Sequence, residues 1–138
     1  MSEINTENLQ RCIDTLEKAY EMCRQAEPDS IDYELYRNAL VKGFEMALEQ
    51  SGKLLKKKIT PYFSSKRAVD TLTFKDIFRH ANKYALLNAT ETARWMIYRD
   101  NRNSTAHDYG EAFAEETLGL IEEFLTDAKH LKEVIDHD

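Results

Sequence analysis

Glycine and proline are scarce in this chain, which contains four glycines and two prolines among 138 residues. The hairpins of a many-stranded β fold need these residues at their turns, so the composition argues against such a fold. Collagen-like and low-complexity chains are excluded for the same reason, and a hydrophobic content of 42% excludes a disordered chain. The length suits a single domain over residues 1–138, large enough to bury a core without metal or disulfide support.

Long apolar runs and paired cysteines are also lacking. No run approaches the ~20 apolar residues of a membrane-spanning helix, so we expect no membrane partner. The first residues are polar and acidic, so neither a signal peptide nor a transit helix is expected. Cys12 and Cys23 lie on one predicted helix, roughly 16 Å apart along its axis, which is too far for a disulfide. We therefore expect a reducing, cytoplasmic location.

The formal net charge of −6 excludes a protein that coats nucleic acid with its whole surface. The charges are unevenly distributed, because residues 52–67 contain six basic side chains and no acidic one. From Glu111 onward there are instead nine acidic residues against two lysines. The basic centre, which includes Lys56 and Lys57 and continues to Arg99, is either a solvated charge run or a patch that binds RNA phosphates or a nucleotide.

Apolar side chains recur every three or four positions nearly throughout the chain, which is the spacing of amphipathic helices. The pattern predicts a first helix over about 9–23 and a longer second helix over about 36–55, which Pro61 stops. A loop is expected at 64–66. Thr73 and Asp76, three positions apart, then fit a capping box at the start of a short third helix.

Two further helices complete the expected fold. Asn88 suits the start of the first of them, whose predicted buried face consists of Ala93, Met96 and Ile97. An acidic amphipathic helix follows over about 113–135. Because the connections are brief, we predict an all-α fold, an antiparallel up-and-down four-helix bundle with an additional short helix.

One segment does not fit an ordinary bundle. Six polar residues follow one another from Arg99 to Ser104, and several of them are residue types that prefer caps and turns to helix interiors. On a continuous helix Asn103 and His107 lie one turn apart on the same face, and the long side chain of Arg102 reaches toward the same side. An arginine, an amide and an imidazole together predict a compact anion site with one group that titrates near neutral pH.

The pattern Arg102-Asn103-x-x-x-His107-x-Tyr109 resembles the Arg-x4-His signature of the HEPN superfamily of small helical bundles. In this form it is most similar to the HepT-type toxins and the nucleotidyltransferase substrate-binding proteins. The likeness covers about residues 9–135, because the long second helix, the short helix after it and the acidic last helix also have counterparts there. Ser104 is a mild departure, since many relatives carry an aliphatic residue after the asparagine.

The resemblance implies a metal-independent endoribonuclease that needs no cofactor. In such enzymes the RNA 2′-hydroxyl attacks the neighbouring phosphate and expels the 5′-oxygen. His107 would act as general acid or base, Arg102 would bind the scissile phosphate, and Asn103 would orient one of them. Asp100 and Glu45 are carboxylates that either support Arg102 or His107 or form surface ion pairs.

The same resemblance implies partners. HEPN proteins form homodimers whose two motifs face each other, and a minimal nucleotidyltransferase of the MntA type neutralises the toxin by transferring AMP to the motif tyrosine, here Tyr109. An alternative is a non-catalytic subunit that binds a nucleotide or substrate for a separate nucleotidyltransferase. A third possibility is a helical interaction module whose motif is degenerate.

Overall fold

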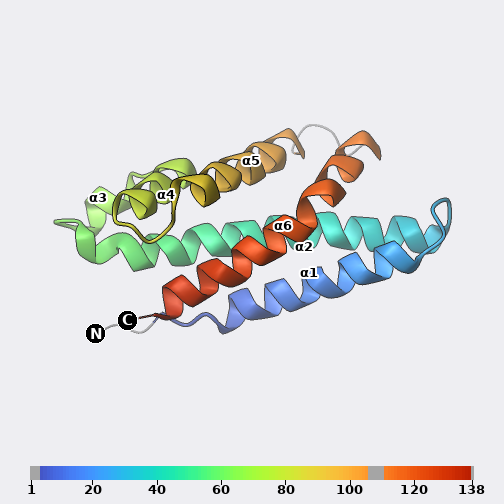
Figure 1. Ribbon diagram of the computed structural model, residues 1–138, viewed down its shortest axis with the longest axis horizontal. Coiled ribbons are helices and arrows are strands. Elements are labelled where there is room, and N and C mark those ends of the chain that lie inside the picture. Colours follow the sequence, from blue (N-terminus) through green and yellow to red (C-terminus); the bar gives the residue numbers. More distant parts are fainter. Residues whose placement is uncertain (1–3, 106–110, 138) are drawn as a thin grey trace.

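The computed structural model describes residues 4–105 and 111–137, without the side chains of 103–105 and 111–114. These residues form helices and no strand, which confirms the all-α fold class. Four long helices alternate in direction along the molecule (Figure 1). In chain order the elements are α1 (Glu7–Gln25), α2 (Ile31–Ile59), the 3-10 turn η1 (Thr60–Tyr62), α3 (Lys66–Asp70), α4 (Phe74–Lys83), α5 (Ala89–Thr105) and α6 (Glu111–Asp136).

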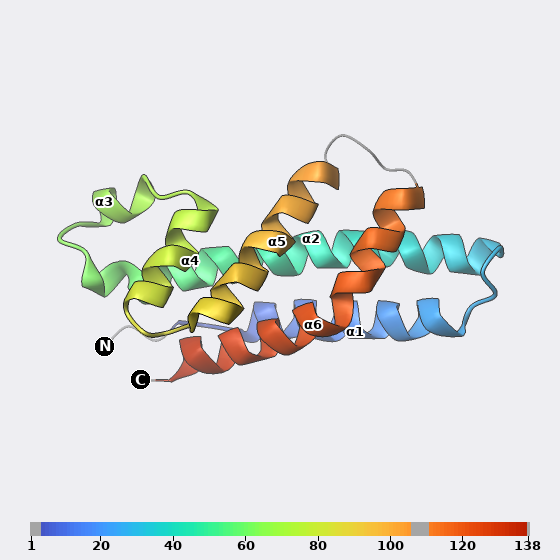
Figure 2. The same cartoon turned by 45° about the horizontal axis from the view of Figure 1, so that its top comes forward.

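Helix α2 is the centre of the fold, because it packs against α1, α4, α5 and α6. It lies alongside α1, while α5 and α6 cross it (Figure 2). It begins earlier than the apolar pattern predicts, because the Ser30 hydroxyl accepts a hydrogen bond from the Tyr33 amide and caps the helix at Ile31. It ends at Ile59, where Pro61 enters the turn that follows.

The connection between α2 and α4 contains more structure than the expected loop. Ser65 caps the five-residue helix α3, which begins at Lys66. The capping box predicted for α4 is confirmed, because the Asp76 amide donates to the Thr73 hydroxyl over 3.1 Å and the Thr73 amide donates to Asp76 Oδ2 over 3.2 Å. The start of α5 is also as predicted, since Asn88 Oδ1 accepts from the Glu91 amide.

The buried face of α5 differs from the predicted one. Ala93 and Ile97 are exposed, with Ile97 at 53%, and Met96 is only half-buried. The helix turns Trp95 and Tyr98 inward instead, because these large rings pack edge-on against Phe124 of α6 at centroid distances of 5.6 and 5.0 Å. The predicted stripe was wrong because the buried face also carries polar residues: Glu91, Thr92 and Asn101.

Gly52 of α2 provides the space for an aromatic ring of α4. A Cβ atom at position 52 would lie 2.7 Å from Cδ2 and Cε2 of Phe74, which is closer than two carbons can approach. We expect Gly52→Ala to lower the free energy of unfolding by about 1–3 kcal/mol through this overlap, although alanine is the better helix former. Urea denaturation measures the change.

Gly119 in α6 supplies the matched control, because a Cβ there would meet nothing within 4 Å. Gly119→Ala is expected to raise the free energy of unfolding by roughly 0.5–1 kcal/mol through helix propensity alone. If Gly52→Ala and Gly119→Ala stabilised the protein equally, the packing of the Phe74 ring would not require a glycine at position 52.

Candidate functional site

Arg102 lies in the last turn of α5, beside a carboxylate of α2. Its Nε is 3.6 Å from Oε2 of Glu45, and both side chains are largely buried, with 29% and 20% exposed. Helix α5 therefore holds the arginine against a side chain of α2. Glu45, one of the two carboxylates proposed as supports, thus lies beside Arg102. An arginine fixed in this way retains the planar donor geometry that suits a phosphate.

Asp100 contacts a different helix. Its Oδ1 accepts a hydrogen bond of 2.6 Å from Lys75 Nζ of α4, and the aspartate side chain is mostly exposed. This ion pair joins α4 to α5 on the protein surface. Asp100 therefore forms a surface ion pair, and its support of Arg102 or His107 stays a prediction.

Arg99, one turn before Arg102 on α5, is held from two sides. Its Nη1 donates a 2.8 Å hydrogen bond to Oε1 of Glu49 on α2. Its guanidinium carbon lies 4.8 Å from the ring centroid of Phe74 on α4, which is a cation–π contact. Three helices thus meet at this one side chain.

A surface groove of about 660 Å³ connects these residues. Arg99, Arg102 and Lys56 line it, although Lys56 also pairs with Asp70 at 2.8 Å. Lys57 does not line this groove but borders another hollow next to the first turns of α1. The groove has an apolar component as well as its charges: Met46, Leu72, Phe74 and Ile77.

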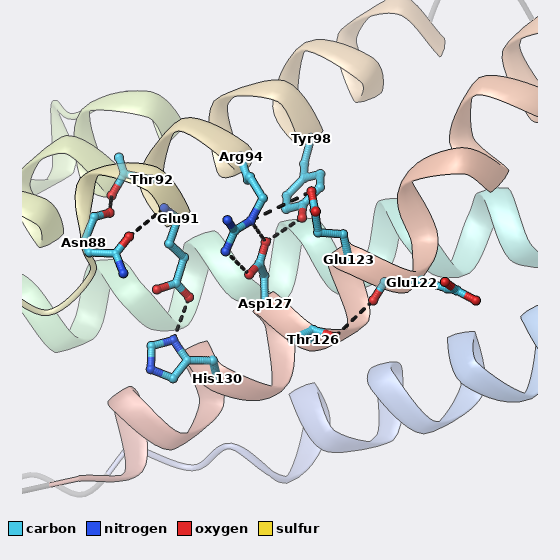
Figure 3. A network of polar contacts seen from close by, with 10 residues as sticks. All are labelled: Asn88, Glu91, Thr92, Arg94, Tyr98, Glu122, Glu123, Thr126, Asp127 and His130. Atoms are coloured by element: carbon cyan, nitrogen blue, oxygen red, sulfur yellow. Dashed lines mark hydrogen bonds and ion pairs between the residues drawn. The ribbon is translucent and has the colours of Figure 1, made fainter.

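A buried polar network fastens α5 to α6 (Figure 3). Asp127 of α6 is 2% exposed and accepts two hydrogen bonds from Arg94, over 2.8 Å from Nε and 2.7 Å from Nη2. The Tyr98 hydroxyl donates to the same carboxylate over 2.5 Å. Burial, and then the hydrogen bond to Asp127, raise the pKa of Tyr98, while the bonded carboxylate raises the pKa of Arg94.

A second contact of the same kind lies near the start of α5. Oε2 of Glu91, whose side chain is 4% exposed, lies 2.6 Å from Nδ1 of His130 on α6 (Figure 3). Neither this contact nor Asp127 was predicted. The signal for Asp127 was present, because it stands three residues after Phe124 and four before Leu131, in register with the buried face of α6.

The remaining motif positions cannot be placed. The side chain of Asn103, and all of His107 and Tyr109, lie outside the described residues. Within the described part, Cys12 and Cys23 are free thiols, as expected. No three His, Cys, Asp or Glu side chains gather there as a metal site. None of the described helices has the length and apolar character needed to cross a bilayer.

Comparison with known proteins identifies relatives over nearly the whole chain. A model of the family "nucleotidyltransferase substrate binding protein like" matches residues 4–137. A Haemophilus influenzae protein named "probable ribonuclease HepT" is 30% identical over 107 residues, which are 78% of this chain and 71% of that protein.

A solved structure shares the fold. It is HI0074 from Haemophilus influenzae, described as revealing the fold of a substrate binding domain of a nucleotidyltransferase. It matches with a TM-score of 0.80 at 24% identity, over 96% of this chain and all of that one. The family model, the sequence relative and the motif resemblance agree, and the chain therefore belongs to the HepT-type nucleotidyltransferase substrate-binding protein family of the HEPN superfamily.

Proposed function

We propose that the protein is a metal-independent endoribonuclease and the toxin of a toxin–antitoxin pair. The observation that carries this function is the placement of Arg102 in the last turn of α5, beside Glu45 and open to a groove with further cations. The motif continues from this arginine to His107 and Tyr109 along the chain. A relative of the chain is named a probable ribonuclease, which supports the same activity.

In the proposed reaction the 2′-oxygen of RNA forms a bond to the adjacent phosphorus while the bond from phosphorus to the 5′-oxygen breaks. The 2′-oxygen loses a proton and the 5′-oxygen gains one, and His107 carries out one of these transfers as general base or acid. Arg102 stabilises the negative charge that develops on the non-bridging phosphate oxygens. Asn103 orients the imidazole or the phosphate by hydrogen bonding. The products are a 2′,3′-cyclic phosphate and a 5′-hydroxyl end.

A homodimer is part of this proposal, with the two motifs facing each other across a twofold axis. We also propose that the protein is cytoplasmic, because both RNA and nucleotides are available there.

The test of the nuclease activity uses purified protein and single-stranded RNA in the presence of EDTA. We expect cleavage products that carry a 2′,3′-cyclic phosphate, and growth arrest when the protein is expressed without a partner. Absence of both cleavage and growth arrest would overturn the nuclease function. Cleavage that EDTA abolishes would contradict its metal independence.

The proposed partner is a minimal nucleotidyltransferase of the MntA type, which acts on Tyr109. The tyrosine oxygen attacks the α-phosphorus of ATP and pyrophosphate leaves, so that the chain gains one AMP group. A bulky anion two residues from His107 would block access of the RNA phosphate. Intact-mass measurement after co-expression should show an increase of one AMP group, which Tyr109→Phe removes; an unchanged mass would contradict the modification.

The alternative function is a non-catalytic subunit that binds a nucleotide or substrate for a separate nucleotidyltransferase. The family is described as substrate-binding, and HI0074 is described as a substrate binding domain of a nucleotidyltransferase. Both descriptions favour this alternative. It predicts co-purification with that enzyme, and nucleotide binding that Arg102→Ala weakens without any RNA cleavage by the unaltered chain. A nucleotide titration that shows no binding would exclude it.

A further inference from the structure

We propose that the groove between α2, α4 and α5 contains a nucleotide-binding subsite in which a base stacks on Arg99 and phosphates contact Lys42 and Lys53. We call these three residues, together with Phe74, the stacking subsite. It lies next to Arg102 in the same groove. The stacking subsite rests on the proposed function for the identity of its ligand as single-stranded RNA.

The first observation is that a stacked pair of aromatic rings carries a cation–π contact with Arg99. The ring of Phe74 lies on that of Phe78, with centroids 4.6 Å apart and an interplanar angle of 29°. The Arg99 guanidinium lies over Phe74 at 4.8 Å. Bases of single-stranded RNA commonly stack on aromatic rings and on arginine planes. Because 27% of the Arg99 side chain is exposed and both Arg99 and Phe74 line the groove, a base in the groove can reach them.

The second observation is that this stack is fixed before any ligand binds. Glu49 holds the Arg99 guanidinium through a 2.8 Å hydrogen bond. Gly52 lets the Phe74 ring approach α2 more closely than any other residue would permit. A preorganised platform loses little conformational entropy when it binds.

The third observation concerns charge, and it distinguishes the base position from the phosphate positions. Arg99 is paired with Glu49, whose negative charge would repel a phosphate placed directly above the pair. The position over Arg99 therefore suits an uncharged base better than a phosphate. The guanidinium contributes its plane, and the carboxylate remains available to accept a hydrogen bond from an amino group of the base.

Phosphate contacts are supplied by lysines that flank this position along α2. Lys42 and Lys53 both line the groove, and neither forms a salt bridge within 4.0 Å with any side chain that the structure describes. Their separation of eleven residues corresponds to roughly 16 Å along the helix. That length suits a strand of several nucleotides better than a mononucleotide. Lysine contacts of this kind make affinity fall as salt increases.

The experiment measures binding of a fluorescein-labelled single-stranded oligoribonucleotide by anisotropy, with full-length protein carrying His107→Ala to prevent cleavage. The decisive variant is Arg99→Lys, which keeps the charge and removes the plane. We expect its affinity to fall roughly 5- to 150-fold, the range given by the stacking free energy of one base. Phe74→Leu should weaken binding as well, with circular dichroism and thermal unfolding used to verify that this variant is folded.

Lys129→Ala is the matched control, because Lys129 pairs with Glu17 between α6 and α1 and does not line the groove. It should leave the affinity unchanged. Normal RNA affinity in Arg99→Lys would overturn the stacking subsite, because charge alone would then account for binding. Lys42→Ala and Lys53→Ala should each reduce the salt dependence of binding, and an unchanged slope in both would overturn their phosphate contacts.

Two further comparisons test whether the ligand is RNA or a mononucleotide, and whether a negative result contradicts the stacking subsite or the nuclease function. AMP in place of the oligonucleotide should bind more weakly, and equal affinity for AMP would contradict single-stranded RNA as the ligand. If the unaltered chain cleaves RNA and Arg99→Lys leaves KM unchanged, the stacking subsite is wrong and the nuclease function stands. If Arg99→Lys abolishes RNA binding but the chain cleaves no RNA, the nuclease function is wrong and the stacking subsite stands.

Discussion

Replacement of Asp127 with alanine is expected to lower the free energy of unfolding by about 3 kcal/mol, the lower end of the range for a buried ion pair, because the Arg94 side chain that remains is 30% exposed. The carboxylate is 2% exposed and receives hydrogen bonds from Arg94 and Tyr98. Its loss leaves the buried Tyr98 hydroxyl without this acceptor, and the Arg94 guanidinium loses its two hydrogen bonds while the exposed Glu123 stays 3.9 Å away. Urea denaturation followed by circular dichroism measures the change.

Glu123 offers a matched control on the same helix and beside the same arginine. It lies 3.9 Å from Arg94, but its side chain is 62% exposed, so Glu123→Ala is expected to change the free energy of unfolding by less than about 1 kcal/mol. Tyr98→Phe, which removes a single hydrogen bond to a charged group, should cost an intermediate ~1.5–3 kcal/mol. Equal effects of Asp127→Ala and Glu123→Ala would show that burial of Asp127 does not determine its contribution.

The same network has a consequence for the candidate site. Arg94 precedes Arg102 by eight residues on α5, which corresponds to roughly 12 Å along the helix. Asp127 of α6 binds Arg94 of α5, and Glu45 of α2 pairs with Arg102 in the last turn of α5. The position of Arg102 therefore depends on contacts at both points. The activity of Asp127→Ala should therefore be measured at a temperature below its unfolding transition, where nearly all of the protein is folded.

The fold was predictable from the sequence because it depends mainly on local signals. Pro61, Asn88 and the capping box at Thr73 are all properties of short stretches of chain, and each placed a helix boundary correctly, while helical spacing identified the long helices themselves. The early start of α2 at Ile31 was missed although Ile31 and Leu35 have helical spacing after the Ser30 cap; both side chains are exposed and do not belong to the core.

The site was only partly predictable, because it depends on residues that meet across helices. Arg102 was identified from its motif, but its pairing with Glu45 joins residues 57 positions apart in sequence. Arg99 over Phe74 and Arg94 on Asp127 are likewise contacts between helices. A single sequence shows which residues are polar, but not which of them are buried together.

Substitutions in the motif should have the largest effects on catalysis. If His107 transfers a proton in the reaction, His107→Ala should lower the RNA cleavage rate by about 10²–10⁴-fold, the usual contribution of general acid–base catalysis. Arg102→Ala should lower it by about 10²–10³-fold, the cost of removing one group that stabilises transition-state charge. Single-turnover cleavage of an end-labelled RNA measures both rates without interference from product release.

Arg102→Lys distinguishes charge from geometry at this position. Lysine retains the positive charge but not the planar pair of donors, so we expect a rate between those of the unaltered protein and Arg102→Ala. Arg79→Ala is the matched control, because Arg79 is an exposed arginine of α4 that pairs with Asp76 and does not line the groove. Its cleavage rate should be normal. Equal cleavage rates for Arg102→Ala and Arg79→Ala would show that Arg102 contributes no more to the reaction than an exposed arginine outside the groove.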